Sequence, residues 1–369
     1  MTAWAACAGG ALATALNWAH GSAATERVKV TGFIDAYYGW SQPLQGRGLT
    51  RTARQFDPRN DEPRLAAAQL NIVYTDPRGR FGATISPWLG DNADLLFLSE
   101  RTDSKIAQHL AQAFVTFTDL KSGLGIDVGK FYSWIGYESP ESMGDDLYTR
   151  GLLYTLAQPV YHVGARANRQ FNPRWGASLF AVNGWNQVER AGGGLTIGVQ
   201  LRYAPDAKSN VTVGFISGRE GADRPNHAGS FGGIGYGSPG PAQTDLIDLS
   251  VTRQTTDRLK IALNADYASA HGNDKSGTWA GGALSARYQQ NGKLGFGARV
   301  ESVQDVGGLR LGQSATLGSF SFGVDYWAHP QVLLRAEYRK DWSNVALFTS
   351  RSGLRAQQSS FNLAVEVKF

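Results

Sequence analysis

Four carboxylates lie close together between residues 138 and 146 of this sequence: Glu138, Glu141, Asp145 and Asp146. Arg150 is the only basic residue between residues 136 and 157. Fixed charges of this kind orient and filter polar solutes when walls of low dielectric constant surround them. The segment 136–157 is therefore a candidate site for charge-dependent selection of solutes.

Arginines elsewhere occupy alternate positions of extended segments, on the side that carries other polar residues. The six candidates are Arg166, Arg202, Arg287, Arg299, Arg335 and Arg339. If segment 136–157 folds against them, acidic and basic groups would face one another across a constriction and create a transverse field. The alternative is a solvated acidic surface outside the fold, with the arginines paired to neighbouring Glu301 and Glu337. The same polar side also carries five acidic residues, which leave the ion preference open: Asp35, Asp127, Asp248, Asp266 and Asp325.

The elements that would position these charges are strands, and the clearest of them ends the sequence, from Ser359 to Phe369. One face of this strand is apolar and comprises Phe361, Leu363, Val365, Val367 and Phe369. A soluble β-domain rarely stops on an exposed aromatic residue, whereas the closing strand of a bacterial outer-membrane barrel turns this face to lipid. We therefore expect a membrane barrel in which this strand also serves barrel assembly.

Similar alternating segments recur from residue 27 onwards. Turn residues such as Asp76-Pro77-Arg78-Gly79 and Asn291-Gly292-Lys293 mark seven short connections, and eight longer polar stretches lie between them. This succession predicts an all-β fold, a transmembrane antiparallel up-and-down β-barrel of about sixteen strands, with fourteen or eighteen left open. Short periplasmic turns, long extracellular loops and a single barrel domain over residues 25–369 complete the prediction.

The alternation within the strands supports a wet interior. A charge that faces lipid at mid-bilayer costs about 2–4 kcal/mol, so charged residues should face the lumen. In segment 331–341, Leu334 and Tyr338 alternate with Arg335 and Glu337. Polar residues on one face of every strand would leave no apolar set to fill a core, which disfavours a β-sandwich.

Aromatic residues are expected to form two bands, as at the two interfaces of a membrane. The turn-side band comprises Tyr74, Phe81, Phe117, Trp175, Tyr203, Tyr288, Tyr326 and Trp327. The loop-side band comprises Trp40, Trp88, Trp134, Trp185, Trp279 and Trp342. The alternative is that aromatics are simply common in strands.

Residues 1–24 contain no Lys, Arg, Asp or Glu, run apolar from Ala3 to Leu16, and end in Ser22-Ala23-Ala24. This pattern predicts a secretory signal peptide cut near Thr25, although basic residues are missing at its start, which leaves a misplaced start codon open. An ordinary buried N-terminal helix is the alternative. Removal of the leader would take Cys7, the only cysteine, and with it any disulfide or thiolate chemistry.

Composition and charge exclude several classes. The mean hydropathy is −0.28, which barrel strands permit because their two faces alternate. The net charge of +5 is interspersed along the chain and forms no basic stripe for nucleic acid. The sequence points to no cofactor.

Several short motifs are distinctive: V-T-G-F-I-D-A-Y-Y from residue 30, G-K-F-Y-S-W-I-G-Y-E-S-P from Gly129, Tyr148-Thr149-Arg150-Gly151, P-V-Y-H-V-G-A-R from Pro159, and V-N-G-W from Val182. Together they resemble those of the OmpL-like β-barrel porin family of Gram-negative outer membranes. The resemblance covers nearly all of the chain after the leader. It implies an outer-membrane barrel of the channel type, and it implies no transported solute and no catalytic residue.

Other constellations carry weaker signals. His162 is a strand histidine directed at the lumen, and no serine signature accompanies it, so we predict no catalytic residues and no enzyme. The glycines at 232, 233, 235 and 237 lack the strand and helix of a phosphate-binding loop. Asp91-Asn92-Ala93-Asp94 and Asn273-Asp274 lack a full set of calcium ligands, so no metal site is predicted.

The sequence therefore predicts an outer-membrane porin, a water-filled channel for passive diffusion of small hydrophilic solutes or ions, constricted by the loop 136–157. The alternative is an outer-membrane barrel whose extracellular loops form a binding or adhesion surface with little channel activity. The expected partners are outer-membrane lipid, lipopolysaccharide, the barrel-assembly machinery, small solutes and, by analogy with general porins, two further copies in a homotrimer.

Overall fold

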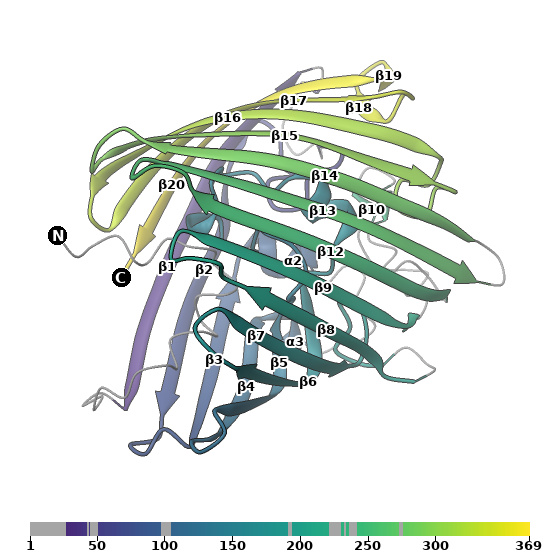
Figure 1. Cartoon of the computed structure of the whole chain (residues 1–369). Helices are drawn as coiled ribbons and strands as arrows, with labels where there is room; N and C mark the ends of the chain where they lie inside the picture. Colours follow the sequence, from purple (N-terminus) through teal and green to yellow (C-terminus); the bar gives the residue numbers. More distant parts are fainter. Residues whose placement is uncertain are drawn as a thin grey trace.

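The computed structural model describes residues 27–42, 44, 51–96, 105–190, 194–220, 230–231, 234–235, 242–272 and 276–369. Within these residues, sixteen strands close into one antiparallel barrel (Figure 1). In barrel order they are β1 (Val28–Gln42), β2 (Glu62–Thr75), β3 (Phe81–Leu89), β4 (Leu110–Asp119), β5 (Leu124–Tyr132), β6 (Tyr161–Gln170), β7 (Trp175–Val182), β8 (Thr196–Tyr203), β9 (Ser209–Glu220), β12 (Ala242–Gln254), β13 (Leu259–Gly272), β14 (Ser276–Gln289), β15 (Leu294–Val306), β16 (Ala315–His329), β17 (Val332–Ser343) and β20 (Gln357–Lys368). The predicted fold class and strand number are confirmed.

The barrel closes where β20 pairs with both β17 and β1. The Gly32 N–H donates to the Phe369 carbonyl at 2.9 Å, and the Phe369 N–H donates to the Gly32 carbonyl at 3.0 Å. The start of β1 and the end of β20 therefore lie side by side, at the end of the barrel that carries the short turns (Figure 1).

The connections on the other side are long and contain small elements that the sequence pattern did not predict. Two hairpins lie there, β10 (Ser230–Phe231) with β11 (Ile234–Gly235), and β18 (Phe348–Ser350) with β19 (Gly353–Arg355). Two short helices, α2 (Asp91–Leu96) and α3 (Lys105–Gln108), lie between β3 and β4. A 3₁₀ turn, η1 (Ser142–Gly144), and a π-helical turn, η2 (Leu153–Ala157), lie between β5 and β6. No described helix is long and apolar enough to cross a membrane.

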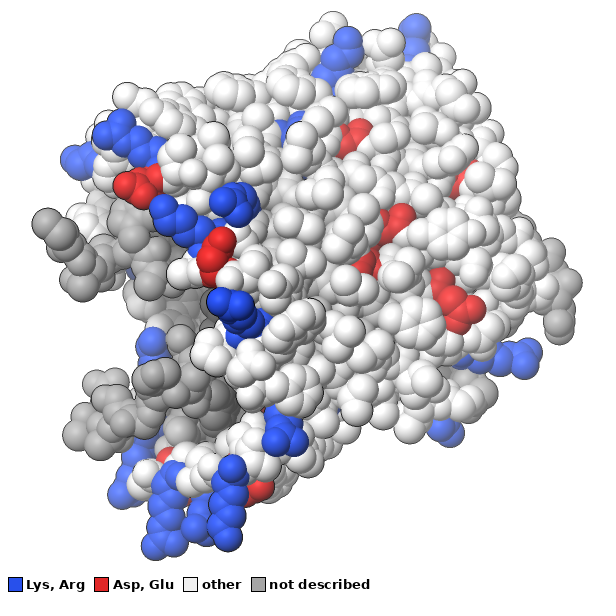
Figure 2. All heavy atoms as spheres, viewed as in Figure 1, with Lys and Arg blue, Asp and Glu red and all other residues white. Residues whose placement is uncertain are grey.

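The outward face of the wall is apolar because side chains alternate along each strand. Ile197, Leu263 and Tyr267 are 59%, 40% and 54% exposed, while Arg335 and Glu337 on the other face are buried. On the visible wall, most Lys and Arg lie near the barrel ends, and a few Asp and Glu lie between them (Figure 2). A largely apolar face of this kind fits the hydrocarbon of a bilayer.

The turn-side aromatic band lies on this outward face, where Phe81, Phe117, Trp175 and Tyr326 are exposed. The loop-side band is largely wrong as a prediction. Trp40 and Trp342 are exposed, but four members of that band are buried: Trp88, Trp134, Trp185 and Trp279. Their rings pack with inward-folded connections, which offer a larger apolar contact than a membrane interface does.

The expectation that no apolar set fills the interior is also wrong for the half of the barrel near the long loops. Inward positions on β9, β12, β15 and β16 there carry Ile216, Leu246, Val303 and Leu317, all buried in one cluster with side chains of the long connections. Alternation tells which side of the wall a residue faces, whereas the connections that fold over it decide whether that side is wet.

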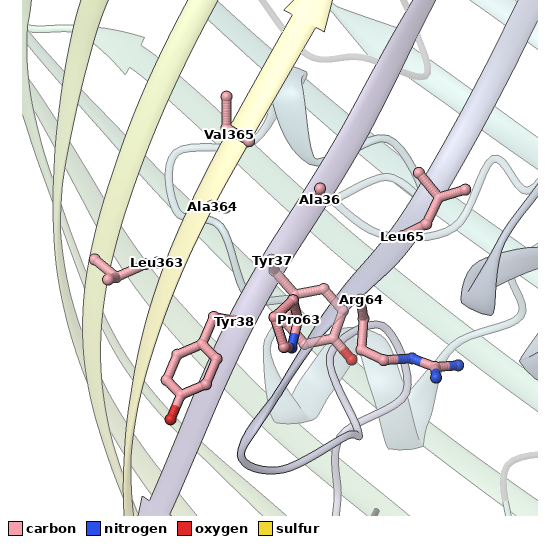
Figure 3. Close-up of a pocket in the computed structure, with 9 residues that line it drawn as sticks. All are labelled: Ala36, Tyr37, Tyr38, Pro63, Arg64, Leu65, Leu363, Ala364 and Val365. Atoms are coloured by element: carbon pink, nitrogen blue, oxygen red, sulfur yellow. The ribbon is translucent and has the colours of Figure 1, made fainter.

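A pocket of about 520 Å³ opens at the closing seam, over β20, β1 and β2 (Figure 3). The β1 strand shifts its register against β2 between Asp35 and Ala36 at this place. Leu65, Leu363 and Val365 line the pocket and are exposed, so it forms a depression in the outward, lipid-facing surface.

The predicted leader, residues 1–24, lies outside the described residues, as do the glycines at 232, 233 and 237. The signal peptide therefore stays a prediction.

Candidate functional site

The connection between β5 and β6, residues 133–160, lies inside the barrel, and we call it the inner loop. It bonds to inward-facing side chains of strands on several sides of the wall, including Gln69 of β2, Asn264 of β13, Arg299 of β15 and Glu337 of β17. Every residue from 145 to 160 is buried. The inner loop contains the whole of the predicted segment 136–157.

Apolar contacts hold the two ends of the inner loop. The Trp134 ring stacks on Phe180 of β7 with a centroid distance of 3.6 Å. Gly198 of β8 and Gly214 of β9 leave room for this end of the loop, because a Cβ atom would collide with Trp134 at Gly198 and would lie 2.9 Å from Ile135 at Gly214. Near its other end, the loop buries Leu153 and Leu156 in the same apolar cluster. We call Trp134, Ile135, Leu153 and Leu156 the apolar anchor.

Charged and polar contacts hold the middle of the inner loop. The carboxylate of Glu138 bonds to Arg299 of β15 and accepts the Gly151 N–H at 2.7 Å. The Thr149 N–H donates to Glu337 of β17 at 2.9 Å. The Ser142 hydroxyl lies within hydrogen-bond distance of Asp35 Oδ2, at 2.9 Å, and of Glu366.

Bases from three strands hold the next part of the loop, one through the Asp146 carboxylate and two through main-chain carbonyls. Asp146 Oδ1 lies 2.7 Å from Lys260 Nζ of β13, and its main-chain carbonyl accepts from Arg287 of β14 at 3.1 Å. Arg335 of β17 donates to the carbonyl oxygens of Ser142 at 2.7 Å and Asp145 at 3.1 Å. We call Glu138, Ser142, Asp145, Asp146 and Thr149, together with the wall residues that they contact, the charged anchor.

Arg150, the fifth predicted residue of the segment, bonds mainly within the inner loop. It donates to the Ser139 carbonyl at 3.1 Å and to the Tyr148 carbonyl at 3.0 Å, and its guanidinium lies 3.7 Å from the Asp145 carboxylate. Its own carbonyl accepts from Arg339 of β17 at 2.7 Å. Arg150 therefore shapes the loop, while Arg339 ties that shape to the wall.

The six predicted wall arginines divide into two groups. Arg287, Arg299, Arg335 and Arg339 contact the inner loop. Arg166 instead pairs with Asp127 of β5 at 2.6 Å, and Arg202 donates to Asn210 of β9 at 2.9 Å. The alternative, in which the arginines pair with acids of the wall, holds for one of the two acids, because Arg299 Nε lies 3.1 Å from Glu301. The other acid, Glu337, bonds to Thr149 instead.

Residues that the sequence reasoning missed complete the site. One is Lys260 of β13, which pairs with Asp146. Gln69 of β2 donates to Glu141 at 2.6 Å, and the Tyr132 hydroxyl lies 3.2 Å from the same oxygen. The alternation of β2 could have identified Gln69, whereas nothing local links it to Glu141.

Residues 51–57, which lie between β1 and β2, also pack inside the barrel. Arg54 and Asp57 form a buried ion pair at 2.6 Å, and Arg51 donates to Asn362 of β20 at 3.0 Å. Burial alone would raise the pKa of Asp57, but Arg54 and Arg51 outweigh it and hold that pKa below its ordinary value.

The inner-loop carboxyls shift in the opposite direction. Burial raises the pKa of Glu138 against the opposing effect of Arg299, and it raises the pKa of Glu141 against hydrogen bonds from Gln69 and Tyr132. Burial, followed by repulsion from Glu138, raises the pKa of Asp145 well above its ordinary value, although Arg150 opposes the shift. The charge of the inner loop is therefore sensitive to pH above the usual carboxyl range.

His162 has a serine beside it after all. Its Nδ1 lies 2.9 Å from the Gly184 carbonyl, so Nδ1 carries the proton and Nε2 accepts from the Ser133 hydroxyl at 3.1 Å. The imidazole is fully buried beneath the Trp134 ring at a centroid distance of 4.5 Å. This pair packs the start of the inner loop against β6 and does not face lipid.

The remaining candidates do not assemble. Asp91 bonds to Arg64 and lies in the first turn of α2, and Asn273 and Asp274 lie outside the described residues. The described residues contain no group of three or more His, Cys, Asp or Glu side chains that could hold a metal ion.

Comparison with known protein families gives one match over almost the whole chain. A family model described as "Putative beta-barrel porin-2, OmpL-like" matches residues 27–369. No curated protein sequence matches the chain.

Solved structures of similar shape are outer-membrane proteins. The outer membrane channel DcaP of Acinetobacter baumannii gives a TM-score of 0.62 at 9% identity, with 93% of this chain and 97% of that chain covered. An anion-selective porin from Comamonas acidovorans gives 0.60 at 9% identity, with 93% and 99% covered. The trimer form of OmpT, an outer membrane protein of Vibrio cholerae, gives 0.58 at 11% identity, with 93% and 99% covered. At these identities the likeness concerns the fold.

Proposed function

The chain belongs to the OmpL-like family of β-barrel porins of the outer membrane, and we propose that it forms a water-filled channel for passive diffusion of small hydrophilic solutes or ions, constricted by residues 136–157. Porin membership and the sixteen-strand barrel point to a channel rather than an enzyme. One observation carries the finer part of the proposal: the inner loop bonds inside the barrel to bases on β13, β14, β15 and β17. Such a segment narrows a lumen and lines it with fixed charge.

The exposure of the wall ion pairs favours anionic solutes. In the pair Arg166–Asp127 the base is 14% exposed and the acid 8%. The base is again the more exposed partner in Lys260–Asp146, at 16% against 7%, and in Arg287–Asp325, at 17% against 5%. Two pairs are reversed: Arg299–Glu138, at 2% against 12%, and Arg335–Asp325, at 1% against 5%. We therefore expect small carboxylates to enter liposomes faster than sugars of equal size.

Planar-bilayer recording tests the channel itself. Protein refolded into detergent and added to a bilayer should give reproducible single-channel steps. Correctly folded protein that stays silent would contradict the proposal.

Charge neutralisation tests the constriction. Glu138→Gln, Glu141→Gln, Asp145→Asn and Asp146→Asn together should shift the reversal potential under a salt gradient towards anions, because the opposing bases remain. A matched control carries Asp→Asn at four positions in short turns: Asp76, Asp119, Asp206 and Asp257. If both quadruple variants keep the native reversal potential, the loop does not set ion preference.

Assembly and partners follow from the barrel surface. The trimer form of OmpT motivates a homotrimer, which cross-linking in native membranes would detect.

We propose that the outward face of β20 engages the barrel-assembly machinery, and that lipid and lipopolysaccharide surround the finished wall. This face comprises Phe361, Leu363, Val365, Val367 and Phe369. Deletion of Phe369 should then slow membrane insertion in cells, while the free energy of unfolding of the refolded barrel should change little.

A second candidate function is a barrel whose extracellular loops bind a partner and conduct little. The buried apolar cluster in the half of the barrel near the long loops favours it, because dry packing there leaves less room for water. Silence in the bilayer, combined with saturable binding of the folded protein to whole cells, would support this candidate over the channel.

A further inference from the structure

An apolar hollow lies on the outward face of the wall, where the barrel closes. It is the pocket of about 520 Å³ over β20, β1 and β2, with Leu363 and Val365 on one side and Leu65 on the other (Figure 3). Ala36 lies between them, and its small side chain leaves the space open. Because this face meets hydrocarbon, a group that fills the hollow must be apolar, and it gains dispersion contacts there.

A polar row crosses the same seam nearer the long loops. Lys340 of β17 is directly opposite Ser359 of β20, which is directly opposite Gln42 of β1, so the three side chains share one face. Leu363 follows Ser359 by an even number of residues, which places the row and the hollow on the same outward face, about 13 Å apart along β20. Exposed aromatic side chains flank the row, as is typical at the level of lipid headgroups: Trp40, Trp342 and Phe361.

The charge of the polar row calls for an anion. Lys340 is exposed, and no hydrogen bond or ion pair involves it among the described residues. Asp341, the only acid between residues 340 and 360, is buried and pairs with Arg339 at 2.6 Å. The other charged residues of that interval, Arg351 and Arg355, are basic and exposed. A cation on the outer wall of a barrel is costly in hydrocarbon but is tolerated near the headgroups, where lipid anions neutralise it.

We propose that the seam binds one lipopolysaccharide molecule, with a phosphate of its lipid A at Lys340 and one of its acyl chains in the hollow. Lipid A carries phosphates on a sugar core together with several acyl chains, so one molecule supplies both groups. The long loops are extracellular, and lipopolysaccharide is the lipid of the leaflet on that side. Ser359 and Gln42 add a hydroxyl and an amide that can donate to sugar or phosphate oxygens.

A lipid in this position would hold the seam together. Its contacts would span β17, β20, β1 and β2, and they exist only when β20 has paired with β1. A ligand that binds only the closed barrel stabilises it against unfolding. The inference rests on the proposed partnership with lipopolysaccharide, for which it names the residues, and it does not depend on conduction.

Binding of lipopolysaccharide to the refolded barrel tests the proposal. Native mass spectrometry of protein refolded in detergent should show one lipopolysaccharide molecule per chain, and added lipopolysaccharide should raise the thermal unfolding midpoint. Lys340→Gln should weaken the affinity by about fivefold, since one cation near the headgroups is lost. Dephosphorylated lipopolysaccharide should bind native protein and Lys340→Gln equally. Ala36→Leu should weaken the binding of both forms of the lipid, because the added side chain fills the hollow.

Two matched controls separate the site from general effects of charge and apolar area. Lys293→Gln removes an exposed lysine from a short turn, and Ala298→Leu enlarges an outward alanine of β15 away from the seam. Both should bind lipopolysaccharide like the native protein. If Ala36→Leu does not fold, as judged by heat-modifiable mobility on gels, Lys340→Gln with the two forms of the lipid decides alone.

Three results would overturn the proposal. The first is native protein that binds lipopolysaccharide no more tightly than phosphatidylethanolamine. The second is native affinity in Lys340→Gln and in every folded Ala36→Leu preparation. The third is a disulfide between two copies of Leu363→Cys in protein that binds no lipopolysaccharide, which would assign the hollow to a second copy of the chain. Bilayer recording of the same preparations keeps the channel separate: single-channel steps without lipopolysaccharide binding refute only the seam site, whereas binding by silent protein supports the seam site and refutes the channel.

Discussion

The inner loop is held by two anchors of opposite chemistry. The apolar anchor packs Trp134 and Ile135 against β7, β8 and β9, and Leu153 and Leu156 into the internal apolar cluster. The charged anchor lies between these ends and bonds to strands on other sides of the wall. Burial of a large apolar side chain stabilises directly, at about 25 cal/mol per Å² removed from water. A buried ion pair contributes little net stability, because desolvation offsets most of the attraction.

This difference separates two tasks within one loop. The apolar anchor supplies the free energy that keeps the loop inside the barrel. The charged anchor fixes which charges stand at which place, and it tolerates replacement only when partners change together. Variants of the two anchors should therefore differ in whether a second substitution can rescue the first.

Trp134→Ala gives the largest expected effect. The substitution empties the space between Phe180 and His162, and loss of a buried Trp side chain should reduce the free energy of loop docking by up to about 5 kcal/mol. Amide hydrogen exchange of residues 133–160 would report this as faster local opening, while the barrel strands stay protected.

Trp175→Ala is the matched control, because Trp175 lies on the outward face and stacks on Tyr203 of the neighbouring strand β8. It should leave exchange of the inner loop unchanged. Equal effects of the two tryptophan variants on the loop would show that the apolar anchor has no special role.

Arg299→Gln gives the second largest effect. It leaves Glu138 buried without its base and leaves Glu301 only the longer contact with Arg339 at 3.9 Å, which together should cost about 3 kcal/mol. Adding Glu138→Gln and Glu301→Gln should recover most of that loss, since the uncompensated charges are gone. Denaturant unfolding of the refolded barrel and exchange of the loop measure both steps. A triple variant as unstable as Arg299→Gln alone would refute the view that this anchor contributes arrangement rather than stability.

The sequence predicted the wall far better than its contents. Alternation placed Arg335, Glu337 and Leu334 on their correct faces, because a single register fixes every side chain of a strand. It could not show that inward Trp279 and Val303 would be dry, because their cover comes from connections distant in the chain. The acidic cluster was visible as a local pattern, whereas its partners Lys260 and Gln69 depend on the path of the loop across the lumen.

A pH titration distinguishes the two anchors, because the charged anchor contains titratable groups and the apolar anchor contains none. Burial raises the pKa of Asp145 in the docked loop, so the docked state binds a proton more tightly than an undocked loop does. Docking is then most stable below the ordinary aspartate pKa of about 4 and weakens as pH rises from there towards neutrality. Glu138 and Glu141 shift in the same direction, whereas the lowered pKa of Asp57 acts only at more acidic pH.

Loop exchange between about pH 4 and pH 8, corrected for the intrinsic rate, measures this slope. Asp145→Asn should flatten it, while Asp119→Asn, at the exposed end of β4, should not. A slope of the opposite sign in the native protein would mean that the carboxylates, rather than the protonated acids, hold the loop.

Tyr132→Phe gives the smallest effect, because it removes only the neutral hydroxyl that hydrogen bonds to Glu141 of the inner loop. The Tyr132 hydroxyl lies 3.2 Å from Glu141, which keeps its 2.6 Å hydrogen bond from Gln69. Loss of a single such bond should cost about 1 kcal/mol of loop docking. Because the ring stays in place, the apolar packing with Tyr161 and its neighbours is unchanged. A cost as large as that of Trp134→Ala, measured by the same exchange experiment, would mean that the hydrogen bond to Glu141, and not apolar burial, holds the inner loop.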